Sequence, residues 1–217
     1  MSDDPNNPGD NISSLLSKHN AINDMYRRAE DALDGEIGGI DWRQMRPEVA
    51  KAEHDYCEQM RQSIRQAVLI MLYSYLEAGM DLIGNRFVTD YTKEIAKEKK
   101  KGDGNFKTRL RVFACSNIAV APAQEDGDIA EALRLVRNCL VHAAGRVAKS
   151  RERQKLEDAI RMLQENGKKS NCQSIEIPDG QILLSGDVLS LANCTSHDLV
   201  WHLYDAAMRS GPKKTTV

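Results

Sequence analysis

The stretch IRQAVLIMLYSYLEAGMDLI, residues 64–83, decides the fold of this 217-residue chain. Its apolar side chains recur three or four residues apart, which is the spacing that gathers them on one face of an α-helix. The longest nearly apolar run, residues 67–83, contains Glu77 and Asp81 and falls short of the roughly 20 apolar residues that a bilayer span needs. We therefore expect a helix buried in the core of a soluble protein, with no membrane partner.

Turn and cap residues divide the rest of the chain into further helices. A first helix is expected from about residues 11–13 to about residue 33, where the Gly-rich sequence DGEIGGID breaks it, and a second helix begins near Pro47. Later helices are expected at about residues 128–144, 149–164 and 187–209, while SIEIPDGQILLS predicts a β-hairpin at about residues 174–185. The expected fold is mainly α, an up-and-down helical bundle with a small β-hairpin near the C-terminus.

Composition indicates one intracellular domain over residues 12–210, between a disordered tail at residues 1–11 and a flexible tail at residues 211–217. The acidic, turn-rich start lacks the basic and apolar segments of a secretory signal, and the five cysteines are scattered without a CxxC pair. Both observations favour the cytoplasm. The net charge of −2 gives no general attraction to phosphate backbones, so any contact with nucleic acid must be local.

Several kinds of site lack support in the sequence. The basic stretch at residues 92–111 is interpreted as a solvated charged surface, with a phosphate-facing strip as the alternative. His197 and His202 are five residues apart, a spacing that does not align two metal ligands on one helix face. No phosphate-binding loop, dinucleotide-binding motif or GxSxG elbow is present. We expect neither a metal nor a cofactor.

The helix expected at residues 128–144 has an unusual polar face. At about 100° of rotation per residue, its core face collects Ile129, Leu133, Val136, Leu140, Ala143 and Ala144. Arg134, Asn138 and His142 lie on the opposite side, and the long stem of Arg137 can reach the same space. A guanidinium matches phosphate oxygens and an imidazole exchanges a proton near neutral pH, so this face suits an anion. A solvated helix face is the alternative interpretation.

The segment RNCLVH at residues 137–142, followed by AAG at residues 143–145, resembles the RNxxxH form of the HEPN signature. In that superfamily four to six residues separate an arginine from a following histidine, often with a polar residue directly after the arginine. The stretch LYSYLEAGMDLI at residues 72–83 is similar to the family's earlier core helix, and Glu77 matches the acidic residue often found there. The resemblance covers roughly residues 55–146 and implies a helical bundle of HEPN type.

The resemblance also implies a metal-independent endoribonuclease whose homodimer forms a composite cleft. His142 would be the general acid or base, Arg137 would stabilise the negative charge on phosphorus, and Asn138 would orient the phosphate or the imidazole. Arg134 is added from the helical wheel as an RNA-binding residue, and Glu77 is a supporting residue expected to pair with Arg134 or Arg137. The expected setting is a toxin or phage-defence component with RNA as substrate and an antitoxin protein as a partner.

Two other functions remain open at this point. A non-catalytic HEPN-like bundle would use the same polar face to bind RNA or a partner protein without turnover, which suits the acidic net charge. A generic helical oligomer without a ligand is the third interpretation.

Overall fold

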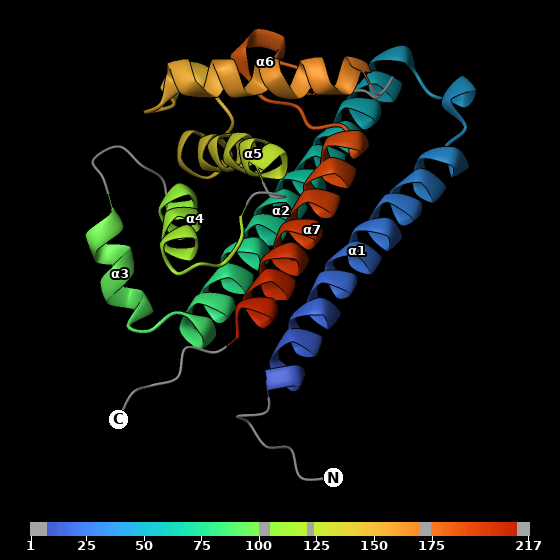
Figure 1. The fold of residues 1–217 in the computed structure, drawn as a ribbon. Helices are drawn as coiled ribbons and strands as arrows, with labels where there is room; N and C mark the ends of the chain where they lie inside the picture. The colour runs from blue at the N-terminus through green and yellow to red at the C-terminus, as the bar shows by residue number, and fades with distance from the viewer. Residues whose placement is uncertain (1–7, 100–104, 121–123, 170–174, 212–217) are drawn as a thin grey trace.

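A computed structural model describes residues 8–99, 105–120, 124–169 and 175–211, which fold into a helical bundle (Figure 1). Within these ranges there are seven α-helices and no strands, so the predicted mainly α class is confirmed. The helices are α1 Pro8–Gly39, α2 Pro47–Phe87, α3 Tyr91–Glu98, α4 Asn105–Cys115, α5 Gln124–Ala143, α6 Arg153–Lys169 and α7 Gly186–Ser210. The short 3-10 helices η1 Trp42–Gln44, η3 Val147–Lys149 and η4 Pro178–Gly180 lie in the connections.

Helix α2 is the central element, and α1 and α7 pack along it (Figure 1). It begins with Pro47 in its first turn, as predicted, because a proline lacks only a backbone N–H that has no partner there. By length and composition α2 could cross a membrane, but 56% of its most apolar window is buried within the protein. A buried core helix meets the same criteria, so this feature does not place α2 in a bilayer.

The core consists of two clusters of buried apolar side chains, and helix α5 contributes to both. Most of its buried side chains pack with the middle of α2, with α6, and with the start of α7. Ala130, nearer its N-terminal end, belongs to a second apolar cluster formed by α4 and the C-terminal parts of α2 and α7. The backbone of α5 is therefore fixed on several sides by neighbouring helices.

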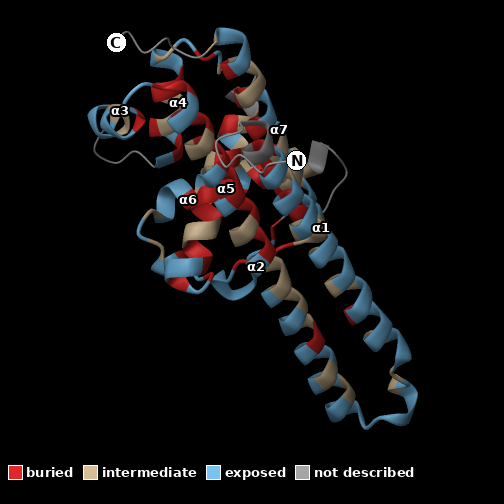
Figure 2. Ribbon diagram, turned by 90° about the horizontal axis from the view of Figure 1, so that it is seen from below, coloured by how far each residue is buried: buried red, intermediate tan, exposed pale blue. Residues whose placement is uncertain are grey.

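The end of α1 and the start of α2 extend beyond the other helices as a helical hairpin (Figure 2). The prediction that α1 ends near residue 33 is wrong, because the helix continues through Gly35 and Gly38 to Gly39. Arg61 of α2 pairs with Asp34 of α1 at 2.5 Å. This contact with α2 favours continuation of α1 past residue 33 despite the low helix propensity of glycine.

Two other boundaries differ from the prediction. Helix α1 begins at Pro8, before the expected start, so the disordered tail predicted for residues 1–11 is wrong over residues 8–11. Residues 1–7, and residues 212–217 of the tail predicted for residues 211–217, lie outside the described residues. Helix α6 spans Arg153–Lys169 rather than residues 149–164. Residues 150–152 consequently belong to the connection between η3 and α6.

The β-hairpin expected at residues 174–185 is not confirmed. Asp179 and Gly180 do form a left-handed turn, with φ of 49° and 76°. On either side of it, however, Glu176 and Leu183 form a single bridge through N–O distances of 3.1 and 2.9 Å. Other backbone groups bond elsewhere, because Ile182 donates to the Gly145 carbonyl at 2.9 Å and Leu184 donates to the Gln62 side chain at 2.9 Å. The segment is thus fastened to α5 and α2 rather than to a second strand.

Candidate active site at the end of helix α5

The C-terminal half of α5 has the buried face that the sequence predicted. Leu133, Val136, Leu140 and Ala143 are buried, and Ile129 packs against the same cluster. Ala144 is an exception, because it lies beyond the helix with φ of 49° and its side chain is exposed. The core therefore fixes the rotation of α5, and with it the directions in which residues 137, 138 and 142 project.

The helix ends immediately after His142 and Ala143. Gly145 has φ of 74°, a conformation that side-chain-bearing residues rarely adopt, and its N–H donates to the Cys139 carbonyl at 3.1 Å. The Gly145 carbonyl accepts from Ile182, which ties the end of α5 to the 175–185 segment. His142 therefore lies in the last turn of a well-anchored helix, where its side chain is exposed.

Arg137 and Asn138 are in direct contact. Arg137 Nη1 donates to Asn138 Oδ1 at 3.0 Å, although the two residues are adjacent in the sequence. The Nε atom of Arg137 is buried and has no hydrogen-bond partner in the described part of the chain. An arginine has five N–H donors, so this guanidinium retains donors for another acceptor.

Asn138 and His142 line one cavity of about 440 Å³. Their helix supplies one wall together with Ala143, and the η3–α6 connection supplies the other wall through Lys149, Ser150, Arg151 and Glu152. Pockets of about 300–1,000 Å³ are of the size that binds small ligands or parts of larger ones. Asn138 belongs both to this cavity and to the contact with Arg137, so it links the three residues of the RNxxxH motif.

Arg134 does not belong to this exposed group, contrary to the expectation from the helical wheel. Its side chain is buried, with only 9% of the residue exposed, and its guanidinium donates two hydrogen bonds of 2.9 Å to Glu131. A third contact joins its Nη1 to Glu152 at 3.4 Å. Burial lowers the pKa of Arg134, but the hydrogen bonds and charge of Glu131 outweigh that effect and raise it. The expectation of a free RNA contact at Arg134 is therefore wrong.

Glu77 also has a different partner from the one expected. Its carboxylate pairs with Arg109 of α4 at 3.2 Å, and Arg109 bonds in turn to both oxygens of Asp81 at 2.8 and 2.7 Å. These contacts fasten α4 to α2. Glu77 does not line the cavity beside His142, and its ion-pair partner is Arg109 rather than Arg134 or Arg137, so it connects α2 to α4.

The sequence analysis did not single out four of the cavity residues, and two of them, Lys149 and Arg151, are cations; the others are Ser150 and Glu152. The two cations lie in the basic run that follows the end of α5, which was interpreted as the start of a charged helix. Their position in the sequence could have indicated this. Both follow Gly145 within a few residues, and the chain there must turn back past the last turn of α5. In the described part of the chain, no cluster of three or more histidine, cysteine or acidic side chains could hold a metal ion.

Comparison of the chain with protein-family models, with curated proteins and with solved structures finds no match. The geometry at the end of α5 is therefore the basis on which a function is inferred. That geometry combines a guanidinium with unused donors, an amide bonded to it, and an exposed imidazole that shares a cavity with the amide.

Proposed function

We propose that this protein is a metal-independent endoribonuclease of HEPN type, with Arg137, Asn138 and His142 as its catalytic residues. One observation carries the proposal. Asn138 accepts a hydrogen bond from Arg137 at 3.0 Å and lines the same cavity as His142, so a phosphate in that cavity would meet Asn138 and His142. Arg137 does not line the cavity and is connected to it through Asn138. The resemblance of RNCLVH to the HEPN signature supports the same assignment.

The proposed reaction is an attack of an RNA 2′-hydroxyl on the adjacent phosphorus. A histidine removes the 2′-hydroxyl proton as the new P–O bond forms, and a second proton passes to the departing 5′-oxygen as its bond to phosphorus breaks. The products are a 2′,3′-cyclic phosphate and a 5′-hydroxyl. Arg137 stabilises the extra negative charge on the phosphoryl oxygens, and Asn138 orients both the guanidinium and the phosphate.

Proton removal and proton donation require two proton-exchanging groups, while one protomer contributes one imidazole to the described cavity. A homodimer resolves this, because two-fold symmetry brings a second His142 to a shared cleft. Val141, which is 45% exposed directly beside His142, offers an apolar contact for the partner. Such a nuclease suits a cytoplasmic toxin or phage-defence component that an antitoxin protein restrains.

Cleavage of a single-stranded RNA by the purified protein tests the proposal. We expect cutting in excess chelator, with cyclic phosphate ends detected by mass spectrometry. His142→Ala should lower the rate by at least about 100-fold, the usual contribution of a general acid or base. Arg137→Ala should lower it by a similar factor through loss of charge stabilisation.

His202→Ala is the matched control, because His202 is an exposed histidine on α7 that does not line the cavity. It should keep the wild-type rate, and all variants should keep the wild-type circular dichroism and oligomeric state. Loss of cleavage in chelator would contradict the mechanism in favour of a metal-dependent one. RNA binding without any cleavage by the wild type would instead support the non-catalytic bundle.

A further inference from the structure

The wall of the cavity that faces α5 carries two cations without acidic partners. Lys149 and Arg151 are exposed, both line the cavity that contains His142, and neither forms an ion pair with a carboxylate in the described part of the chain. The neighbouring Arg153, by contrast, pairs with Glu157 at 2.7 Å. Lys149 and Arg151 are therefore available to an anion that enters the cavity.

One carboxylate, Glu152, also lines the cavity, but its charge is already compensated. Arg134 Nη1 lies 3.4 Å from Glu152 Oε2, and Lys155 Nζ lies 3.3 Å from Glu152 Oε1. Both cations come from outside the set of cavity-lining residues, so the wall keeps the net positive charge of Lys149 and Arg151. This gives the buried Arg134 a function different from RNA contact, which is to neutralise the acid beside the cavity.

The backbone that carries these cations is ordered by local hydrogen bonds. Lys149 donates to the Arg146 carbonyl at 3.0 Å, and Ser150 donates to the Val147 carbonyl at 3.1 Å. The Val147 side chain is buried in the core, and Arg146 donates to the Ala143 carbonyl at 2.9 Å. The backbone of the connection is thus held against the end of α5, so the two cations start from the chain segment that faces His142 across the cavity.

We propose that Lys149 and Arg151 bind the phosphates of a single-stranded RNA on either side of the bond to be cut. This inference rests on the proposed function and names the means by which an acidic protein retains its polyanionic substrate. Lysine and arginine contacts to a phosphate backbone are sequence-independent and salt-dependent. The two residues would hold the strand so that one phosphate lies between His142 and the Arg137–Asn138 pair.

Binding of a single-stranded DNA provides a direct test, because DNA has the same phosphates and lacks the 2′-hydroxyl that the cleavage reaction uses. Fluorescence anisotropy should be recorded over a salt series, with RNA of the same sequence bound to His142→Ala as a second probe. Lys149→Gln and Arg151→Gln should each weaken binding several-fold. Each should also reduce the slope of log affinity against log salt by about 0.7, the value for one phosphate contact on a single strand.

Arg161→Gln is the charge-matched control, because Arg161 is exposed on α6, pairs with Asp158 and does not line the cavity. It should leave the affinity and the salt slope close to those of the wild type. In cleavage assays the Lys149 and Arg151 variants should raise KM more than they lower kcat, which a purely structural role would not produce.

The possible failures are distinguishable. If both cation variants match Arg161→Gln in affinity and slope while His142→Ala still abolishes cleavage, the RNA-binding inference is overturned and the nuclease proposal stands. If the wild type cuts no RNA but loses affinity on Lys149→Gln and Arg151→Gln, the nuclease proposal fails and the binding site stands. If the wild type binds neither nucleic acid, the binding inference is overturned directly.

Discussion

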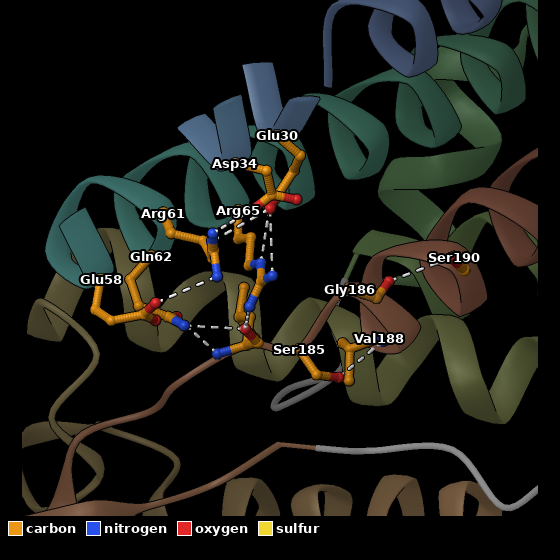
Figure 3. A network of polar contacts seen from close by, with 11 residues as sticks. Glu30, Asp34, Glu58, Arg61, Gln62, Arg65, Ser185, Gly186, Val188 and Ser190 are labelled. Carbon is orange, nitrogen blue, oxygen red and sulfur yellow. Dashed lines mark hydrogen bonds and ion pairs between the residues drawn. The ribbon is translucent and has the colours of Figure 1, made fainter. Parts of the chain in front are cut away.

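Two arginines that join α2 to α1 have several acceptors each, whereas two cations of the cavity at the end of α5 have no carboxylate partner in the described residues. Arg65 pairs with Glu30 at 2.8 Å and donates to the Leu184 carbonyl at 3.0 Å (Figure 3). Arg61 reaches Glu30, Asp34 and Glu58 at 3.4, 2.5 and 3.2 Å (Figure 3). Lys149 and Arg151, by contrast, have no carboxylate partner in the described residues.

The difference separates cations that hold helices together from cations available to a ligand. A half-buried arginine with several acceptors fixes the position of two or three chain segments, and its removal leaves carboxylates without compensation. An exposed cation without a partner contributes little to folding, so its removal costs little stability. Arg134 is the best test of this distinction. It lies on α5, the helix that carries the site, but it is buried and bound to carboxylates like the arginines that hold helices together.

The largest effect on stability is expected at Arg134. Arg134→Met keeps much of the side-chain volume but leaves Glu131 and Glu152 without their shared cation. Removing one partner of a buried ion pair is strongly destabilising, so we expect the free energy of unfolding to fall by about 3 kcal/mol. Urea denaturation followed by circular dichroism measures this change.

A second substitution separates the two causes of that loss. Adding Glu131→Gln to Arg134→Met removes the nearer uncompensated carboxylate, so it should restore part of the lost stability. A double variant less stable than Arg134→Met would show that lost packing, rather than unpaired charge, dominates.

A smaller loss is expected at Arg65 in the other region. Arg65→Met removes the partner of Glu30 and the donor to Leu184, but Arg61 still lies 3.4 Å from Glu30. We expect a loss of about 2 kcal/mol in the free energy of unfolding, since one cation remains. Lys149→Gln, measured in the same denaturant series, should stay within about 0.5 kcal/mol of the wild type. Equal losses at residues 65 and 149 would contradict the division into bracing and available cations.

Much of the fold follows from local patterns. The apolar spacing of residues 64–83 predicted α2, and Pro47 marked its start. The glycines at residues 35 and 38 led to a wrong prediction of where α1 ends. Helix propensity describes single residues and does not include the tertiary contact between α1 and α2. The alternation of apolar and polar residues around Asp179 and Gly180 predicted two strands. The same pattern fits a turn whose flanking apolar side chains, Ile175 and Ile182, are buried in the core.

The site was predicted less completely, for a geometric reason. The main partner of Arg134, Glu131, is three residues earlier on the same helix, so this pairing was local information that the helical wheel contained and the prediction missed. The wheel could not show the second partner, Glu152, which comes from the next connection. The partner of Glu77 comes from α4, whose approach to α2 is also a tertiary feature. Asn138 and His142 share a cavity because they are four residues apart near a helix end, which is local information.

The smallest effect compares two histidines, one in each region. His19 of α1 is buried, at 3% exposed, beside the ring of Tyr75, whereas His142 is exposed at the cavity. Burial lowers the pKa of His19, and the nearby His197 lowers it further. Below the ordinary histidine pKa of about 6.5, the unfolded state therefore binds more protons than the folded state, and acid destabilises the fold.

Between pH 6.5 and 5.5 this linkage can remove at most about 1.4 kcal/mol, because one group releases or binds one proton. We expect the free energy of unfolding to fall over this range in the wild type and to fall less in His19→Gln. Urea denaturation at both pH values measures the difference. His142→Gln, which leaves the buried His19 in place, should keep the wild-type pH dependence. If the free energy of unfolding depended less on pH in His142→Gln than in His19→Gln, the conclusion that His19 is the buried structural histidine would be contradicted.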